Sequence, residues 1–226
     1  MTNVWCHMIK KIDIAGIQLD NYSVKESLMI IDRKLAENIF VTVEEVNSET
    51  LILIKDMPVV GEVINSLELS VIVDNAILKA VGKGSIQRKY EIEGKYFSYE
   101  LFKKIERNHQ TVFLLGETED DLNIMKNYIT EEFPDIKVLG MSAIEDCAGV
   151  NDSIINEINA IDTNVVVSLL PSPVQEQFLS DNRDKLAVNL WYGVKKSAFI
   201  HAKHSIWKKI KERIKIHRLE KHINDF

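Results

Sequence analysis

The chain has 226 residues, of which 46% are hydrophobic and 27% charged, and its formal net charge is −6. This length and apolar content suffice for one sizeable core, and the negative charge argues against a general nucleic-acid binder. The two cysteines, Cys6 and Cys147, lie far apart and outside any metal-ligand spacing, which excludes a disulfide framework and a structural zinc site. No stretch approaches the roughly 20 apolar residues that span a bilayer, and the N-terminus lacks a secretory leader pattern, so we expect a cytoplasmic protein.

Short apolar runs alternate with longer amphipathic stretches, a pattern typical of strands and helices that alternate around a mostly parallel sheet. Ser23 and Glu26 have the spacing of a capping box, which predicts the start of the first helix. The elements predicted in the first half are a strand at 12–19, a helix at 24–37, a strand at 40–46, a helix start at 48–55 and a strand at 69–73. The last of these strands ends at Asp74, at the sheet edge where ligands collect in open α/β folds.

The middle of the chain, residues 81–99, carries three glycines among basic and aromatic residues and is interpreted as a flexible surface loop. Its Gly82 and Gly84 form only a GxG pair, which is too short for a dinucleotide-binding fingerprint. The elements predicted after it are a helix at 99–107, a strand at 111–116, a helix at 117–132, a strand at 136–140, a helix at 152–160, a strand at 164–170, a helix at 174–182 and a closing strand at 186–190. We therefore expect one α/β, Rossmann-like domain over residues 1–200, with a mostly parallel sheet flanked by helices.

Residues 201–226 predict a basic amphipathic C-terminal helix, in contrast to the acidic remainder of the chain. Ile206, Ile210 and Ile214 form an apolar stripe beside Trp207, and basic side chains cover the rest of the helix. The basic residues that could face a membrane surface are Lys208, Lys209, Lys211, Arg213, Lys215 and Arg218. Two interpretations stay open: the helix packs on its own domain, or it lies on the anionic inner face of the cell membrane. The histidines of this region have no third ligand at a suitable spacing, so no metal is expected.

Four motifs follow one another in a recognisable order: IAGIQLDN at 14–21, VFLLG at 112–116, FPDIKVLG at 133–140 and PSPVQEQF at 171–178. A last strand and Gly193 come after them. Over almost the whole chain this order resembles the TagA/WecG/CpsF glycosyltransferases. Members of that family transfer N-acetylmannosamine or a related sugar from a UDP donor to an undecaprenyl-linked acceptor.

The resemblance implies a role for Asp74 as the general base that takes the proton from the acceptor hydroxyl. It implies that Pro173, Gln175 and Glu176 match a nucleotide-contacting Pro-x-Gln-Glu signature. The other positions implied in nucleotide-sugar binding are Ser48, Asn75, Gly116 and Gly193. No cofactor is implied, and a homo-oligomer is expected because members of the family tend to self-associate.

The chain departs from the family pattern at several of these positions. Asn75 stands where the family has a glycine, and Val46, Asn47 and Ser48 stand where it has a Thr-x-Asn motif. A Leu169–Leu170–Pro171 run replaces a GxG-type turn, which predicts side chains where backbone would approach the nucleotide.

Two main functions follow: a UDP-sugar glycosyltransferase, or a catalytically impaired relative that assembles with an active paralogue. A third, a nucleic-acid binder with a basic tail, is disfavoured by the acidic body.

Overall fold

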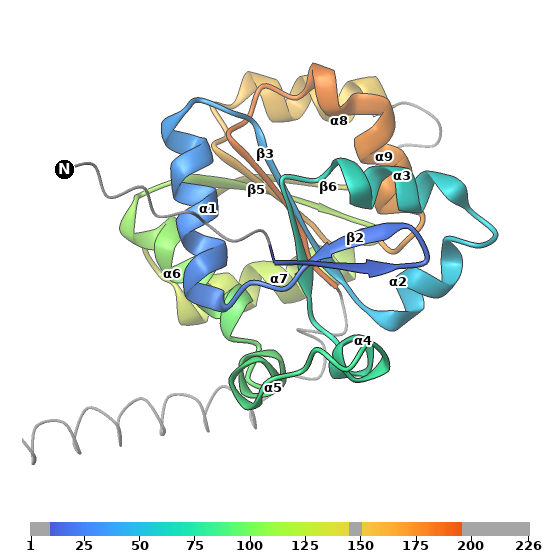
Figure 1. The fold of residues 1–226 in the computed structure, drawn as a ribbon. Coiled ribbons are helices and arrows are strands. Elements are labelled where there is room, and N and C mark those ends of the chain that lie inside the picture. The colour runs from blue at the N-terminus through green and yellow to red at the C-terminus, as the bar shows by residue number, and fades with distance from the viewer. Residues whose placement is uncertain (1–9, 145–150, 196–226) are drawn as a thin grey trace, which may run out of the picture.

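The centre of the fold is a parallel sheet of six strands in the order β4-β3-β8-β7-β5-β6. The computed structural model describes residues 10–144 and 151–195. Every neighbouring pair of strands in this sheet is parallel, and helices flank both faces (Figure 1). The strands are β3 (Val41–Val46), β4 (Leu69–Ile72), β5 (Thr111–Gly116), β6 (Lys137–Ala143), β7 (Val165–Ser168) and β8 (Leu190–Gly193). The predicted Rossmann-like α/β class is thereby confirmed.

Two hydrophobic clusters, one on each face of the sheet, hold the layers together. On one face α1 (Val24–Ala36), α6 (Tyr96–Arg107) and α7 (Glu119–Glu132) pack against alternate strand residues such as Val43 and Tyr192. On the other face α3 (Pro58–Ser66), α8 (Asn151–Ala160) and α9 (Val174–Asn182) pack against the intervening residues, including Val46 and Trp191. Because successive strand residues point to opposite faces, neighbours in β3 belong to different environments.

The single strand predicted at 12–19 was wrong, because this segment forms a hairpin of β1 (Lys11–Ile14) and β2 (Ile17–Asp20). Ala15 and Gly16 have φ values of 52° and 88° and make the two-residue turn, a geometry that suits the twist of hairpin strands. The Asp20 backbone N–H donates to Ser70 Oγ, and the Ser70 N–H donates back to Asp20 Oδ2. The hairpin therefore lies against the edge strand β4.

The flexible loop predicted at 81–99 was also wrong, because α5 (Ile86–Glu93) and the start of α6 occupy much of it. A short helix, α4 (Asn75–Ala80), precedes them. Ser85 caps α5 by accepting a hydrogen bond from the Arg88 N–H at 3.1 Å. Most α5 side chains lie at the surface, so the segment lacks the apolar periodicity that reveals a buried helix.

Most other elements lie within a few residues of their predicted positions, and the capping box of Ser23 and Glu26 is confirmed. The closing strand was misplaced: β8 begins at Leu190, where the predicted strand ended, because pairing with β3 and β7 starts there. Helix α3 was not predicted, whereas α2 (Ser48–Leu53) was. The basic helix expected at 201–226 and both cysteines lie outside the described residues.

Candidate functional site

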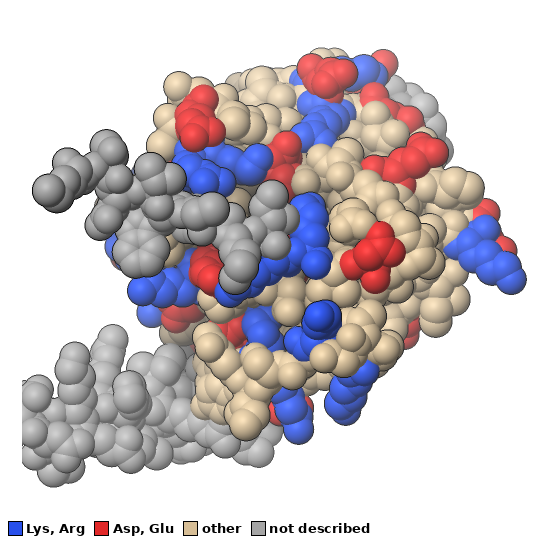
Figure 2. Space-filling model, viewed as in Figure 1, with Lys and Arg blue, Asp and Glu red and all other residues tan. Residues whose placement is uncertain are grey.

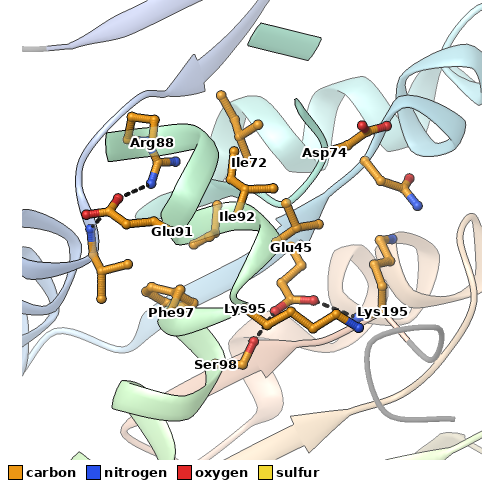
Figure 3. Close-up of a pocket in the computed structure, with 14 residues that line it drawn as sticks. Glu45, Ile72, Asp74, Arg88, Glu91, Ile92, Lys95, Phe97, Ser98 and Lys195 are labelled. Carbon is orange, nitrogen blue, oxygen red and sulfur yellow. Dashed lines mark hydrogen bonds and ion pairs between the residues drawn. The ribbon is translucent and has the colours of Figure 1, made fainter. Parts of the chain in front are cut away.

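A cavity of about 240 Å³ lies at the carboxyl ends of β3 and β4, between these strand ends and helices α5 and α6. This is the edge of a parallel sheet where ligands are expected. Figure 3 shows charged side chains around the cavity that come from separate strands and helices. The polar and charged residues that matter most here are Glu45, Asn47, Asp74, Arg88, Lys95 and Lys195.

Asp74 follows β4 and is the N-cap of α4, which fixes its carboxylate at the rim of the cavity. One carboxylate oxygen accepts the Ala76 N–H at 2.8 Å, and the other accepts the Ser48 hydroxyl and the Ser48 N–H. Burial opposes ionisation, but these hydrogen bonds outweigh it and hold the pKa of Asp74 below its ordinary value. Asp74 is therefore a carboxylate at neutral pH and can accept a proton.

Of the residues predicted around Asp74, Ser48 contacts it directly. Asn75 does not line the cavity. Asn75 is the first residue of α4, and its side-chain amide donates to Glu93 Oε1 at 3.3 Å. Asn47 caps α2 by accepting the Thr50 N–H, and it also lines the cavity. The prediction singled out Ser48 and named Asn47 only as a neighbour in the motif.

Glu45 forms the inner wall of the cavity and is 2% exposed. Its carboxylate accepts hydrogen bonds from the hydroxyls of Ser98 and Tyr192 at 2.6 and 2.7 Å, and from the Lys195 N–H at 3.1 Å. Burial raises the pKa of Tyr192 well above its ordinary value, so its hydroxyl stays a donor. These three donors compensate the buried negative charge.

Two lysines border the same wall, and sequence reasoning selected neither of them. Lys95 has a left-handed backbone, with φ of 52°, and burial lowers its pKa although Glu45 opposes that shift. Lys195 is 9% exposed, and its Nζ donates to Ser172 Oγ at 2.6 Å and lies 3.8 Å from Glu176 Oε1. The sequence could have indicated Lys195, because two consecutive lysines follow the last strand soon after Gly193.

The predicted Gln175, Glu176 and Gly193 gather in a second, closed cluster on the opposite face of β3, together with Glu44. Gln175 and Glu176 are fully buried, and Ser172 Oγ donates to Glu176 Oε1 at 2.6 Å. A Cβ on Gly193 would lie 2.5 Å from Gln175 Nε2 and 2.8 Å from Glu44 Cγ. Gly193 thus gives room for the Gln175 amide, and none of these four residues lines the cavity.

Glu44 is the most perturbed carboxyl group of this closed cluster. Its side chain is almost fully buried and accepts a hydrogen bond from Trp191 Nε1 at 3.3 Å. Burial and the nearby charge of Glu176 raise the pKa of Glu44 to about 8, although Lys195 opposes the shift. Lys195 is the residue shared by both sites, since its backbone serves Glu45 and its side chain serves Ser172 and Glu176.

The remaining predicted positions lie apart from the cavity. Gly116 ends β5, and a Cβ there would lie 2.8 Å from Leu122 Cδ2, so it permits close packing of α7. Pro173 is the N-cap of α9 and borders a separate surface hollow. Leu169 and Leu170 are buried in the two opposite hydrophobic clusters and do not line the cavity.

Within the described ranges, no group of three or more His, Cys, Asp or Glu side chains could hold a metal ion. No helix in the same part of the chain is long and apolar enough to cross a bilayer. The histidines noted near the C-terminus, together with the six basic residues of the expected C-terminal helix, fall outside that part.

The model of the glycosyl transferase WecG/TagA/CpsF family matches residues 12–205, whereas no curated protein matches the chain. The matched range includes every described strand of the six-stranded sheet and all residues of the cavity. The chain therefore belongs to the WecG/TagA/CpsF glycosyltransferase family.

Proposed function

We propose that this chain transfers N-acetylmannosamine or a related sugar from a UDP donor to an undecaprenyl-linked acceptor, using the cavity at the ends of β3 and β4. The observation that carries the proposal is Asp74, an ionised carboxylate held at the rim of a cavity on the ligand-binding edge of the sheet. Family membership supports the reaction class. The acceptor would be reached from the inner face of the membrane, with the chain as a peripheral protein that self-associates.

In the proposed reaction, Asp74 accepts the proton of the acceptor hydroxyl while that oxygen attacks the anomeric carbon of the sugar. A new glycosidic bond forms, the bond from the anomeric carbon to the diphosphate breaks, and UDP leaves with the bonding electrons. Lys95 and Lys195 border the same cavity, where positive charge would favour the developing negative charge on the diphosphate. Asp74 needs no metal ion for its part of this step.

Binding of the donor is the first test of the proposal. Calorimetric titration of the full chain with UDP and then with UDP-N-acetylmannosamine is expected to show saturable binding. Replacing Lys95 with methionine, which keeps the length of the side chain but removes its charge, should weaken the binding of UDP. An assay with a lipid-linked acceptor should then show sugar transfer. Absence of both binding and transfer would overturn the proposal.

A second function is favoured by the way in which Asp74 is already engaged. Both of its carboxylate oxygens accept hydrogen bonds from the chain itself, so a purely structural role as the cap of α4 accounts for its position. A non-catalytic family member that assembles with an active paralogue would keep this arrangement. Co-purification with such a paralogue, combined with no transfer by the isolated chain, would support this alternative, and measurable transfer would exclude it.

A further inference from the structure

Helices α4 and α5 and their connection border the cavity, and we call residues 75–93 the lip. The lip carries an apolar side chain that is almost fully exposed to solvent. Ile86, the first residue of α5, is 92% exposed, and Tyr90, one turn later, is 45% exposed. Burial of an isoleucine stabilises a protein by about 1.5 to 3 kcal/mol, so leaving one in water forgoes that gain. The described part of the chain offers no apolar surface that covers Ile86.

Between residues 75 and 90 of this lip, the exposed charges are all positive. Lys79, Lys83 and Lys89 are all exposed, and no acidic residue occurs between Asn75 and Tyr90. Lys89 lies 3.9 Å from Glu93, but both side chains are more than half exposed, so this pair is weak. Figure 2 shows basic side chains that project from the lower edge of the molecule, where Figure 1 places α4 and α5.

The lip is firmly attached on its inner side, so the exposure of Ile86 does not result from poor packing. Ile77 and Leu78 of α4 are buried in the core. Arg88 of α5 is buried as well, and it donates to Glu91 at 2.7 Å and to Asn21 at 3.2 Å. Part of the lip therefore builds the wall of the cavity, while Ile86 and three lysines of the lip stay exposed.

We propose that the α4–α5 lip docks on an anionic phospholipid surface, with Ile86 in the interfacial layer and Lys79, Lys83 and Lys89 against the headgroups. An exposed apolar side chain on a segment that also exposes three lysines matches the two forces, hydrophobic insertion and electrostatic attraction, that hold proteins on such surfaces. The occupant is a lipid bilayer because an exposed isoleucine, on a segment whose exposed charges between residues 75 and 90 are all lysines, complements a surface that is both anionic and partly apolar. This site is separate from the basic helix expected at 201–226.

Docking by the lip would fix the orientation of the cavity mouth relative to the membrane. Asp74 begins α4, and Arg88 and Glu91 of α5 line the cavity, so the lip connects the lipid surface to the reacting groups. The mouth of the cavity would then face the headgroup layer, where a lipid-linked acceptor presents its hydroxyl. Only this last point depends on the proposed function, because membrane docking itself can be measured without a sugar donor.

The test is binding of the full chain to phosphatidylglycerol-containing vesicles, with pure phosphatidylcholine vesicles as the neutral reference. Each exchange of Lys79, Lys83 or Lys89 for glutamine should weaken partitioning by about fivefold, in line with the effect of a single basic residue at such a surface. Ile86→Asp should weaken it at least as much. Ile124→Asp, at a 41% exposed isoleucine of α7, is the matched control and should bind as the wild type does.

A local probe separates the lip from any other membrane contact of the chain. Tryptophan at position 86, introduced as Ile86→Trp, should shift its emission to shorter wavelength on anionic vesicles, measured against the wild-type background. Ile124→Trp should show no shift. An unshifted Ile86→Trp, or lysine variants that bind as tightly as the wild type, would overturn the proposal. A change in oligomeric state on Ile86→Asp without vesicle binding would overturn it too, and would assign the lip to a protein partner.

Transfer assays distinguish a failure of the lip from a failure of the proposed function. Ile86→Asp should keep its transfer to a short-chain, water-soluble acceptor and lose transfer to the same acceptor embedded in vesicles. Equal loss with both acceptors would contradict a docking role. If the wild type transfers sugar to neither acceptor but Ile86→Trp still reports insertion, the proposed function fails and the docking site stands.

Discussion

Two neighbouring residues of β3, Glu44 and Glu45, lie in opposite environments. Glu45 faces the open cavity beside Asp74, where three hydrogen-bond donors compensate its charge. Glu44 faces the closed cluster of Gln175 and Glu176, where burial and a second carboxylate raise its pKa to about 8. The period of two in a strand is enough to place one side chain on the wall of a cavity and its neighbour in a closed cluster.

From this difference we expect the two faces of the sheet around β3 to have different roles, one in transfer and one in stability. On the cavity face, hydrogen bonds from Ser48 and Ala76 keep Asp74 ionised at the rim of the cavity. On the closed face, Gly193 and Gln175 pack so tightly that they fix the end of β8. Lys195 links the faces, because its backbone binds Glu45 and its side chain binds Ser172. We expect changes on the cavity face to alter transfer and changes on the closed face to alter stability.

Asp74→Asn should have the largest effect on transfer and only a small effect on stability. Asparagine is as good an N-cap as aspartate, and the Ser48 N–H that loses its acceptor can bond to water because Asp74 is only partly buried, so the free energy of unfolding should change by less than about 1 kcal/mol. The amide cannot accept the acceptor proton, so the rate of transfer should fall by about 100- to 10,000-fold. Rates measured with saturating UDP-sugar, together with a denaturant titration, check both parts.

The matched control is Asp152→Asn, the same exchange in the first turn of α8, which should leave transfer unchanged. If Asp74→Asn retained full transfer, Asp74 would be a structural cap and the cavity would need another base.

Gly193→Ala should break the closed face. The added methyl group would lie 2.5 Å from Gln175 Nε2 and 2.8 Å from Glu44 Cγ, so buried side chains must shift. Overpacking of this kind costs about 1 to 3 kcal/mol, measurable by urea unfolding. Gly84→Ala is the control, since its Cβ would meet only Leu78 Cβ at an ordinary 3.7 Å. Equal stability of both variants would show that the Gln175 side is not tightly packed.

The fold was largely predictable from the sequence because buried strands and amphipathic helices leave strong periodic signals. The run at 111–116 and the capping box at Ser23 each identified an element directly. The hairpin at Ala15 and Gly16 and helix α5 were missed for two different reasons. The hairpin was missed because its turn consists of only two small residues, so the segment still resembles one continuous strand. Helix α5 was missed because it lies at the surface with Ile86 exposed and therefore has no apolar stripe.

The site was predictable only in part. The position of Asp74 after a strand, and of Ser48 after the preceding one, sufficed to bring both to the same edge. Sequence could not show that Gln175 and Glu176 point away from the cavity, because that depends on which face of the sheet α9 covers. Lys95 and Lys195 were missed because their approach to Glu45 joins segments that are distant along the chain.

Glu45→Gln, in the wall of the cavity, should lower the free energy of unfolding at neutral pH. An amide offers one acceptor oxygen where the carboxylate uses both, so a donor among Ser98, Tyr192 and Lys195 loses its partner. An unsatisfied buried donor of this kind costs about 1 to 2 kcal/mol. Urea unfolding at pH 7 measures this cost, with Glu62→Gln on the exposed surface of α3 as the control. No difference between the variants would mean that the wall tolerates the loss of the charge.

Glu44→Gln is the subtlest change, since it replaces a carboxyl group that the folded protein already keeps protonated near neutral pH. The folded pKa of about 8 exceeds the ordinary 4.5, so the folded state binds the proton more tightly than the unfolded state does. The stability that this group contributes is therefore full below pH 4.5 and is lost as the pH rises towards 8. At pH 5 the variant and the wild type should differ by less than about 1 kcal/mol, because glutamine can still accept the Trp191 N–H. Between pH 5 and 8 the wild type should lose stability relative to the variant. Parallel unfolding curves over that range would mean that Glu44 is ionised in the folded protein, and the contrast with Glu45 would then have to lie in packing alone.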